Sequence, residues 1–291
     1  MVIAASIAVG LMVGLFSGML GVGGGTLLVP IFRLGFGMDA IACTATSLFT
    51  IIPTSISGAA SHLRKKTCVP ALGLAAGLGG ALTSPLGVWL AGKSPDWAIM
   101  CAAACVIGYS SITMLRKALA APRMSDKSAA AKVSVPVSGV DHLEGKAADN
   151  HHESARRAGG LEPLLPKAGA REVVICALIG LVAGAISGYV GVGGGFIMVP
   201  LMMSLLGVPM RVVSGTSLMA VMILAVPGVA YQGYLGNVEW LAGLAVVFGT
   251  VPGAYVGGRL ASRVPERALR FTFAGFLFLA ALMLVLNQLI Y

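Results

Sequence analysis

Long uncharged apolar runs separated by short polar segments dominate both ends of this chain, and one longer polar segment divides it in the middle. Eight runs carry at most one charged residue each: residues 1–32, 35–61, 69–92, 97–115, 173–210, 212–238, 240–258 and 271–291. A helix that crosses the hydrocarbon core of a bilayer needs about 20 apolar residues. The pattern therefore predicts a series of membrane-spanning helices.

The run over residues 173–210 has 38 residues, which is too long for one crossing, so the chain must turn inside it. The turn is expected at Gly191–Gly195, because consecutive glycines have poor helix propensity. The piece after it, residues 196–208, is long enough for only about 20 Å of helix. Gly21–Gly25 has the same sequence, Gly-Val-Gly-Gly-Gly, so each half is expected to hold four long helices and one short helix.

The amino-acid composition also indicates that most of the protein lies in a lipid bilayer. The chain is 57% hydrophobic and only 11% charged, with a mean hydropathy of +0.91. Soluble domains carry about 25% charged residues. We therefore expect an all-α polytopic protein of the cell (inner) membrane with the lipid bilayer as a partner. The net charge is +9, and the basic residues lie mainly in connecting segments. This distribution is typical of charges that orient a protein in the membrane and not of a surface that binds nucleic acid.

The two halves repeat one another at a constant offset of 170 residues. Between residues 10–30 and 180–200, 12 of 21 positions are identical, including the glycine motif and Pro30/Pro200. The triplet Thr46-Ser47-Leu48 recurs at residues 216–218. A glycine break repeated in two halves of an apolar protein indicates a transport site.

Charge in equivalent loops predicts that the repeats are inverted. The loop after residue 61 carries Arg64, Lys65 and Lys66, whereas its partner at residues 231–238 has no charge. The loop at residues 92–96 has charges that cancel, whereas its partner carries Arg259, Arg263, Arg267 and Arg270. Basic loops stay in the cytoplasm, so each half must cross an odd number of times. We expect two inverted repeats of about five helical segments each, with five crossings per half and both termini outside.

These patterns divide the chain into three parts. Residues 1–116 form the first transmembrane repeat and residues 171–291 the second. Residues 117–170 mix small, polar and charged residues without a hydrophobic period, which predicts a disordered cytoplasmic linker. The linker holds His142, His151 and His152, but these lack a helical i,i+4 partner, so we expect no metal and no cofactor.

The glycine motifs are the predicted substrate site. A run of glycines ends a helix and leaves backbone N–H groups unpaired, and the N-terminus of the next helix favours an anion. The predicted binding residues combine these glycines with duplicated hydroxyls: Gly21, Gly23, Gly24, Gly25, Thr46, Ser47, Gly191, Gly193, Gly194, Gly195, Thr216 and Ser217. Two alternatives stay open, glycine turns that serve packing alone and hydroxyls that bond the i−4 carbonyl. Pro30 and Pro200 are predicted hinges, with a simple kink as the alternative.

Other motifs are interpreted as structural. Four Gly-x-x-x-Gly pairs are expected to be close-packing faces: Gly14/Gly18, Gly73/Gly77, Gly184/Gly188 and Gly253/Gly257. His62 is expected in a loop that sets orientation, and no acidic residue lies deep in an apolar run. Without a nucleophile–base pair at membrane depth, we expect no catalytic residues and no enzyme.

The segments at residues 14–30 and 184–200, each followed by Thr-Ser-Leu, resemble the sulfite exporter TauE/SafE family over nearly the whole chain outside the linker. The resemblance implies an inner-membrane permease for sulfur oxyanions or organosulfonates with about eight spanning helices, and the long linker leaves room for a regulatory role.

Three functions follow from the sequence. The first is a carrier for a small anion that works by alternating access between the repeats. The alternatives are a passive anion channel and a non-transporting membrane scaffold. Substrate identity, direction, coupling ion and the formation of homo-oligomers are left open by the sequence.

Overall fold

The computed structural model describes residues 2–119 and 169–290, and this part of the chain is built from ten α-helices without strands. The helices are α1 (Val2–Leu20), α2 (Gly25–Phe36), α3 (Ala40–Arg64), α4 (Pro70–Ala91), α5 (Asp96–Leu119), α6 (Ala170–Val190), α7 (Gly195–Leu205), α8 (Met210–Tyr234), α9 (Trp240–Ala261) and α10 (Glu266–Ile290). The all-α class and the five helical segments in each half are confirmed. The linker prediction, with its three histidines, lies outside the described residues.

Two short helices follow the glycine motifs, as predicted. Helix α2 has 12 residues and α7 has 11, and both begin at the last glycine of the motif. Six of the described helices are long and apolar enough to cross a membrane, namely α3, α4, α5, α6, α8 and α9. The protein is therefore a multi-pass membrane protein.

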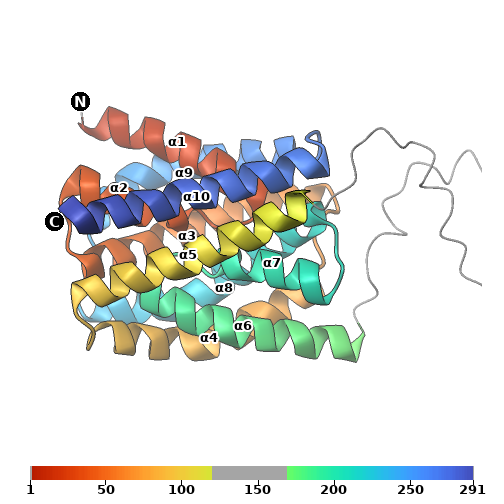
Figure 1. Ribbon diagram of the computed structural model, residues 1–291, viewed down its shortest axis with the longest axis horizontal. Helices are drawn as coiled ribbons and strands as arrows, with labels where there is room; N and C mark the ends of the chain where they lie inside the picture. The colour runs from red at the N-terminus through yellow and green to blue at the C-terminus, as the bar shows by residue number, and fades with distance from the viewer. Residues whose placement is uncertain (1, 120–168, 291) are drawn as a thin grey trace, which may run out of the picture.

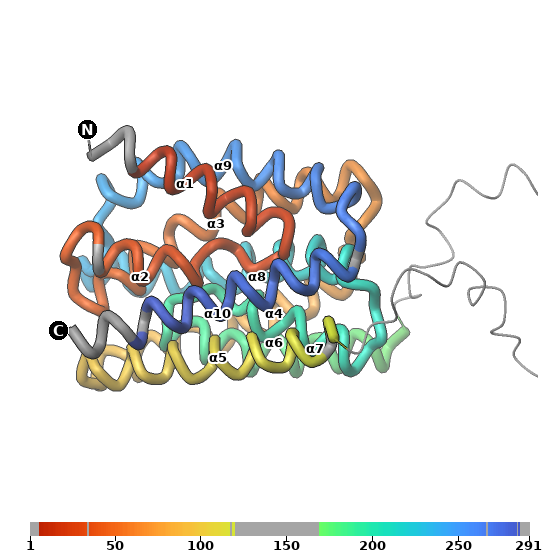
Figure 2. The backbone as a smooth tube through the Cα atoms, turned by 45° about the horizontal axis from the view of Figure 1, so that its top comes forward, coloured from red at the N-terminus to blue at the C-terminus, as the bar shows by residue number. Residues whose placement is uncertain are grey.

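The course of the chain differs from five crossings per half. Helices α1 and α2 form the two arms of a V, with its tip inside the bundle and both open ends on the side of the N-terminus (Figure 2). The short helix thus returns toward the side from which α1 entered, because the glycine turn reverses the chain. Both ends of the chain lie at one end of the bundle, whereas α5 ends and α6 begins at the opposite end (Figure 1).

The two halves interleave. Helix α1 packs on α9, α4 packs on α6, and α3 and α8 contact each other as well as these pairs. Glycine permits this approach: a Cβ added at Gly14 or Gly184 would overlap the backbone of Thr250 or Gly80, respectively. The other predicted Gly-x-x-x-Gly positions also face neighbouring helices, so these close-packing faces are confirmed.

His62 is not a loop residue, contrary to expectation. It lies in the last turn of α3 with 1% of its surface exposed. Its Nδ1 lies 2.9 Å from the Thr67 hydroxyl and its Nε2 lies 3.0 Å from the Gly18 carbonyl oxygen. In the second half, Gln232 and Asn237 occupy the positions of His62 and Thr67 and hydrogen-bond each other. The His62 imidazole in the first half thus takes the place of the Gln232 amide in the second, and each side chain hydrogen-bonds a residue five positions later.

The acidic residues lie at helix ends, as predicted. Asp39 and Glu239 precede α3 and α9, Asp96 begins α5, and Glu172 lies in the first turn of α6. Arg33 lies 4.0 Å from both Asp39 and Asp96, so one guanidinium faces two carboxylates.

Candidate functional site

The two glycine turns meet inside the bundle. A Cβ added at Gly25 would lie 2.5 Å from the carbonyl oxygen of Val192, and one added at Gly195 would lie 2.6 Å from that of Gly21. All residues of both motifs are buried. The N-termini of α2 and α7 therefore converge, and with them the positive ends of two helix dipoles.

Left-handed backbone explains why these positions are glycine. The φ angles are 82° at Gly21, 85° at Gly23 and 86° at Gly24, and 75° at Gly191 and 76° at Gly193. Left-handed helical backbone costs roughly 1–2 kcal/mol for a residue with a Cβ. The duplicated motif thus encodes a duplicated reversal of the chain.

The first turn leaves a group of backbone donors without partners. The amide of Gly21 donates to the Ser17 carbonyl at 2.8 Å, and regular bonding resumes at Leu27 and Leu28, which donate to Gly24. No acceptor among the described residues pairs with the five amides between these points, those of residues 22–26. Buried N–H groups are normally satisfied. Five buried donors in one turn are therefore able to hydrogen-bond an anion or water.

Two equivalent aliphatic side chains cover the turns. Ile51 on α3 and Val221 on α8 are related by the 170-residue offset, and both are fully buried. A Cβ at Gly23 would lie 2.9 Å from Val221 and 3.2 Å from Ile51, and one at Gly193 would lie 2.6 Å from Ile51. Ile51 thus packs against both turns, and Val221 packs against the first.

Of the duplicated hydroxyls, those of the two threonines both accept a hydrogen bond from a distant backbone amide. The Thr46 hydroxyl accepts from the Glu239 amide at 3.0 Å, and that of Thr216 accepts from the Val69 amide at 3.1 Å. Both threonines therefore tie α3 and α8 to the N-terminal ends of α9 and α4. Thr216 also donates to the i−4 carbonyl of Val212 at 2.8 Å, as the structural alternative anticipated.

The serines differ between the halves. Ser217 donates to the Gly21 carbonyl at 2.7 Å and so secures the first glycine turn from α8. Ser47 is fully buried and has no hydrogen-bond partner in the described structure. Ser47 lies one helical turn before Ile51, on the same face of α3.

Further unpartnered hydroxyls near the turns were missed by sequence reasoning. A Cβ at Gly24 would lie 3.5 Å from the Ser17 hydroxyl, and one at Gly23 would lie 3.3 Å from that of Ser55. Thr26 follows the motif directly, and Ser187 is the equivalent of Ser17. Within the described residues all four hydroxyls are buried and unpaired. The recurrence of Ser17 at position 187 was the available signal, since both serines belong to the repeat.

The polar character is concentrated in the first half. Phe196 stands in the second repeat where the first has Thr26, and Ala225 stands where the first has Ser55. Both turns hold amides without an acceptor among the described residues, but only the first adds the hydroxyls of Thr26 and Ser55. Charged side chains do not line this region in the described part of the chain, so an anion here would be held by neutral dipoles.

The predicted hinges lie inside the short helices. Pro30 is within α2 and Pro200 within α7, and both helices continue beyond them. No cluster of metal-ligating side chains occurs among residues 2–119 and 169–290.

Comparison with known proteins agrees with this architecture. The family model for the sulfite exporter TauE/SafE matches residues 6–284. The chain is 24% identical to the probable membrane transporter protein YunE of Bacillus subtilis over 90% of this chain and 88% of that protein. It is 24% identical to the probable membrane transporter protein YjnA of the same organism, over 96% and 98% respectively.

No solved structure gives a significant match. The family model covers nearly the whole chain, including both glycine turns and the helices that pack around them. This chain therefore belongs to the sulfite exporter TauE/SafE family of membrane transporters.

Proposed function

We propose that this protein is a secondary carrier of the inner membrane for small anions, specifically sulfur oxyanions or organosulfonates. The observation that carries the proposal is the set of five buried, unpaired amides at residues 22–26, beside the N-terminus of α2. Donors in a water-excluded site bind an oxyanion strongly, because no other group competes for them. The sulfur class rests on the family, and the anion class rests on these donors.

The first glycine turn would be the anion seat. The hydroxyls of Ser17, Thr26 and Ser55 would add donors on the sides of α1, α2 and α3. The predicted role of Ser47 is retained. Thr46, Thr216 and Ser217 would act instead by fixing the backbone around the seat, since their hydroxyls already hydrogen-bond other parts of the chain.

The mechanism we propose is alternating access between two inverted repeats. The pairing of α1 with α9 and of α4 with α6 exchanges equivalent helices of the halves, which supports a two-fold relation in the membrane plane. The closed packing of Ile51 and Val221 favours a carrier over an open channel. Rocking one half against the other would separate these side chains on one side at a time.

The test is uptake of labelled sulfite, thiosulfate and short sulfonates into proteoliposomes that contain the full chain. Ser55→Ala removes one donor to a charged ligand, which is worth about 1.5–3 kcal/mol, so KM is expected to rise about tenfold or more. Ser61→Ala is the matched control, because Ser61 is also buried and unpaired but lies beside His62 and Gly258. Its KM should stay unchanged.

Three outcomes contradict the proposal. Folded protein that transports none of these anions would reject the carrier function. Equal KM values for Ser55→Ala and Ser61→Ala would reject the seat at the first turn. Flux that ignores every imposed ion gradient would instead indicate a channel.

A further inference from the structure

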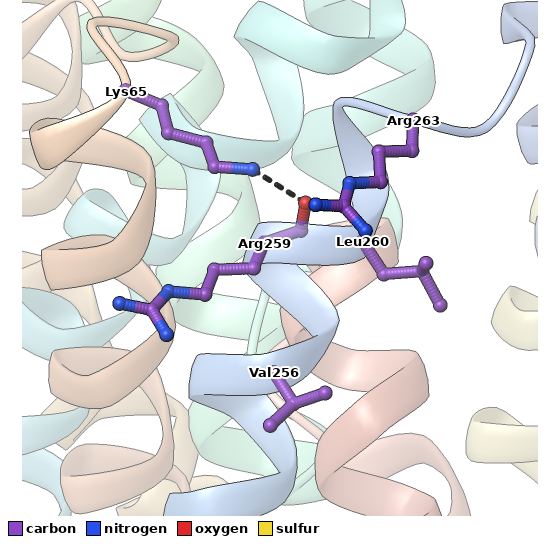
Figure 3. A pocket seen from close by; sticks show the side chains of 5 residues that line it. All are labelled: Lys65, Val256, Arg259, Leu260 and Arg263. Carbon is purple, nitrogen blue, oxygen red and sulfur yellow. Dashed lines mark hydrogen bonds between the residues drawn. The ribbon is translucent and has the colours of Figure 1, made fainter.

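A pocket lies at the end of the bundle, where the turn between α3 and α4 meets the C-terminal end of α9. Its volume is ≈ 360 Å³, and Figure 3 shows its five lining residues: Lys65, Val256, Arg259, Leu260 and Arg263. The pocket joins the two basic loops that charge patterning predicted on the cytoplasmic side. Their contact is direct, since the Lys65 ammonium donates to the Arg259 carbonyl and to the Ser262 hydroxyl.

The pocket is positively charged without a compensating carboxylate among its lining residues. Partial burial lowers the pKa of Lys65, and the nearby guanidinium groups of Arg263 and Arg259 lower that pKa further. Arg259 stacks 4.4 Å over the Tyr255 ring and donates to its hydroxyl at 2.8 Å. The Arg263 guanidinium has no ion pair or hydrogen bond within the described residues. The Lys65 ammonium and the Arg263 guanidinium point toward each other, whereas the Arg259 guanidinium points away from them toward Tyr255 (Figure 3).

The lower wall of the pocket is apolar. Val256 and Leu260 lie one turn apart on α9, with 51% and 38% of their surfaces exposed. Figure 3 shows Val256 and Leu260 below the ends of the Lys65 and Arg263 side chains. Tyr255 lies at the same level, as aromatic residues do at the membrane–water interface. A cationic rim above an apolar wall fits an amphiphile, because a soluble anion would use only the rim.

We propose that this pocket binds an anionic phospholipid, with the phosphate held by Lys65 and Arg263 and an acyl chain lying along Val256 and Leu260. Arginine suits this role, because its planar fork binds phosphate oxygens in pairs. The leaflet that faces basic loops is rich in anionic lipid, and basic pockets at this level recognise such head groups. The lipid would bridge the first repeat, through Lys65, to the second repeat, through α9.

The experiment titrates delipidated full-length protein with dioctanoyl phosphatidylglycerol and follows the midpoint of thermal unfolding. Dioctanoyl phosphatidylcholine and inorganic phosphate are the parallel ligands. Phosphatidylglycerol is expected to raise the midpoint at concentrations where the other two do not. Arg263→Gln is expected to weaken its apparent affinity about fivefold, the effect of one basic residue near an anionic surface, and Arg263→Lys should restore most of it.

Lys66→Gln is the matched control, because it removes one positive charge next to Lys65, in the turn between α3 and α4, without lining the pocket. Its affinity should remain within about twofold of the parent. Equal losses in Lys66→Gln and Arg263→Gln would overturn the proposal in favour of a diffuse surface field. Protection by inorganic phosphate as strong as that by phosphatidylglycerol would overturn it in favour of a site for a soluble anion, and equal protection by phosphatidylcholine would reject the role of charge.

Discussion

The approach of the two glycine turns can be tested with a single methyl group at Gly25. This glycine is the first residue of α2, and its φ is outside the left-handed region, so alanine adds bulk without backbone strain. The added Cβ would lie 2.5 Å from the Val192 carbonyl oxygen and 2.6 Å from the Ile51 side chain. Cβ atoms do not come closer than 3.0 Å to other atoms, so the turns must separate by about 0.5 Å.

Forcing a methyl group into a packed interior costs about 1–3 kcal/mol. Gly25→Ala is therefore expected to lower the free energy of unfolding by this amount and to reduce anion uptake severely, because the gap opens at the proposed seat. Gly35→Ala is the matched control in the same helix, since a Cβ there meets nothing within 4 Å. It should be neutral or stabilise the helix by up to about 1 kcal/mol.

The assay pairs thermal unfolding of the purified protein with uptake into proteoliposomes for both variants. If Gly25→Ala matched Gly35→Ala in stability and transport, the turns would not approach each other as described. If Gly25→Ala lost stability but kept full transport, the turns would meet for packing alone.

Three further outcomes follow from the contacts. Thr216→Val removes the acceptor of the Val69 amide and should cost about 1–3 kcal/mol of unfolding free energy. Thr216→Ser keeps a hydroxyl and should keep most of the stability. Equal midpoints of thermal unfolding for the two variants would contradict the hydrogen bond between α8 and the start of α4. His62→Gln should cost less than about 1 kcal/mol, because glutamine forms the matching bond at the equivalent position. His62→Leu should cost about 1–3 kcal/mol, because it removes the bond to the Gly18 carbonyl and the ring contact with the Thr67 hydroxyl. Urea or thermal unfolding that ranks the two variants the other way would be inconsistent with this equivalence. Deletion of residues 125–167 should leave anion uptake largely intact, and loss of uptake by folded protein would favour the scaffold function.

The helices and the repeat were predictable because their causes are local. Uncharged runs set the spans, and the 170-residue recurrence of the glycine motif set the positions of α2 and α7. The predicted contact-forming glycines were also correct, since a missing side chain marks close helix approach in lipid. His62 was misplaced, because neighbouring cations suggested a loop and nothing local revealed its bond to the Gly18 carbonyl.

The sequence by itself determined the membrane as solvent, the two repeats and the sites of chain reversal, since hydropathy and backbone freedom belong to single residues and their neighbours. Tertiary structure alone decided which hydroxyls remain available. Thr46 and Thr216 are engaged by loops 193 and 147 residues away, whereas Ser17 and Ser55 are left beside the first turn without partners. Whether a buried donor is satisfied depends on distant segments of the chain, and only packing of the two halves fixes that distance.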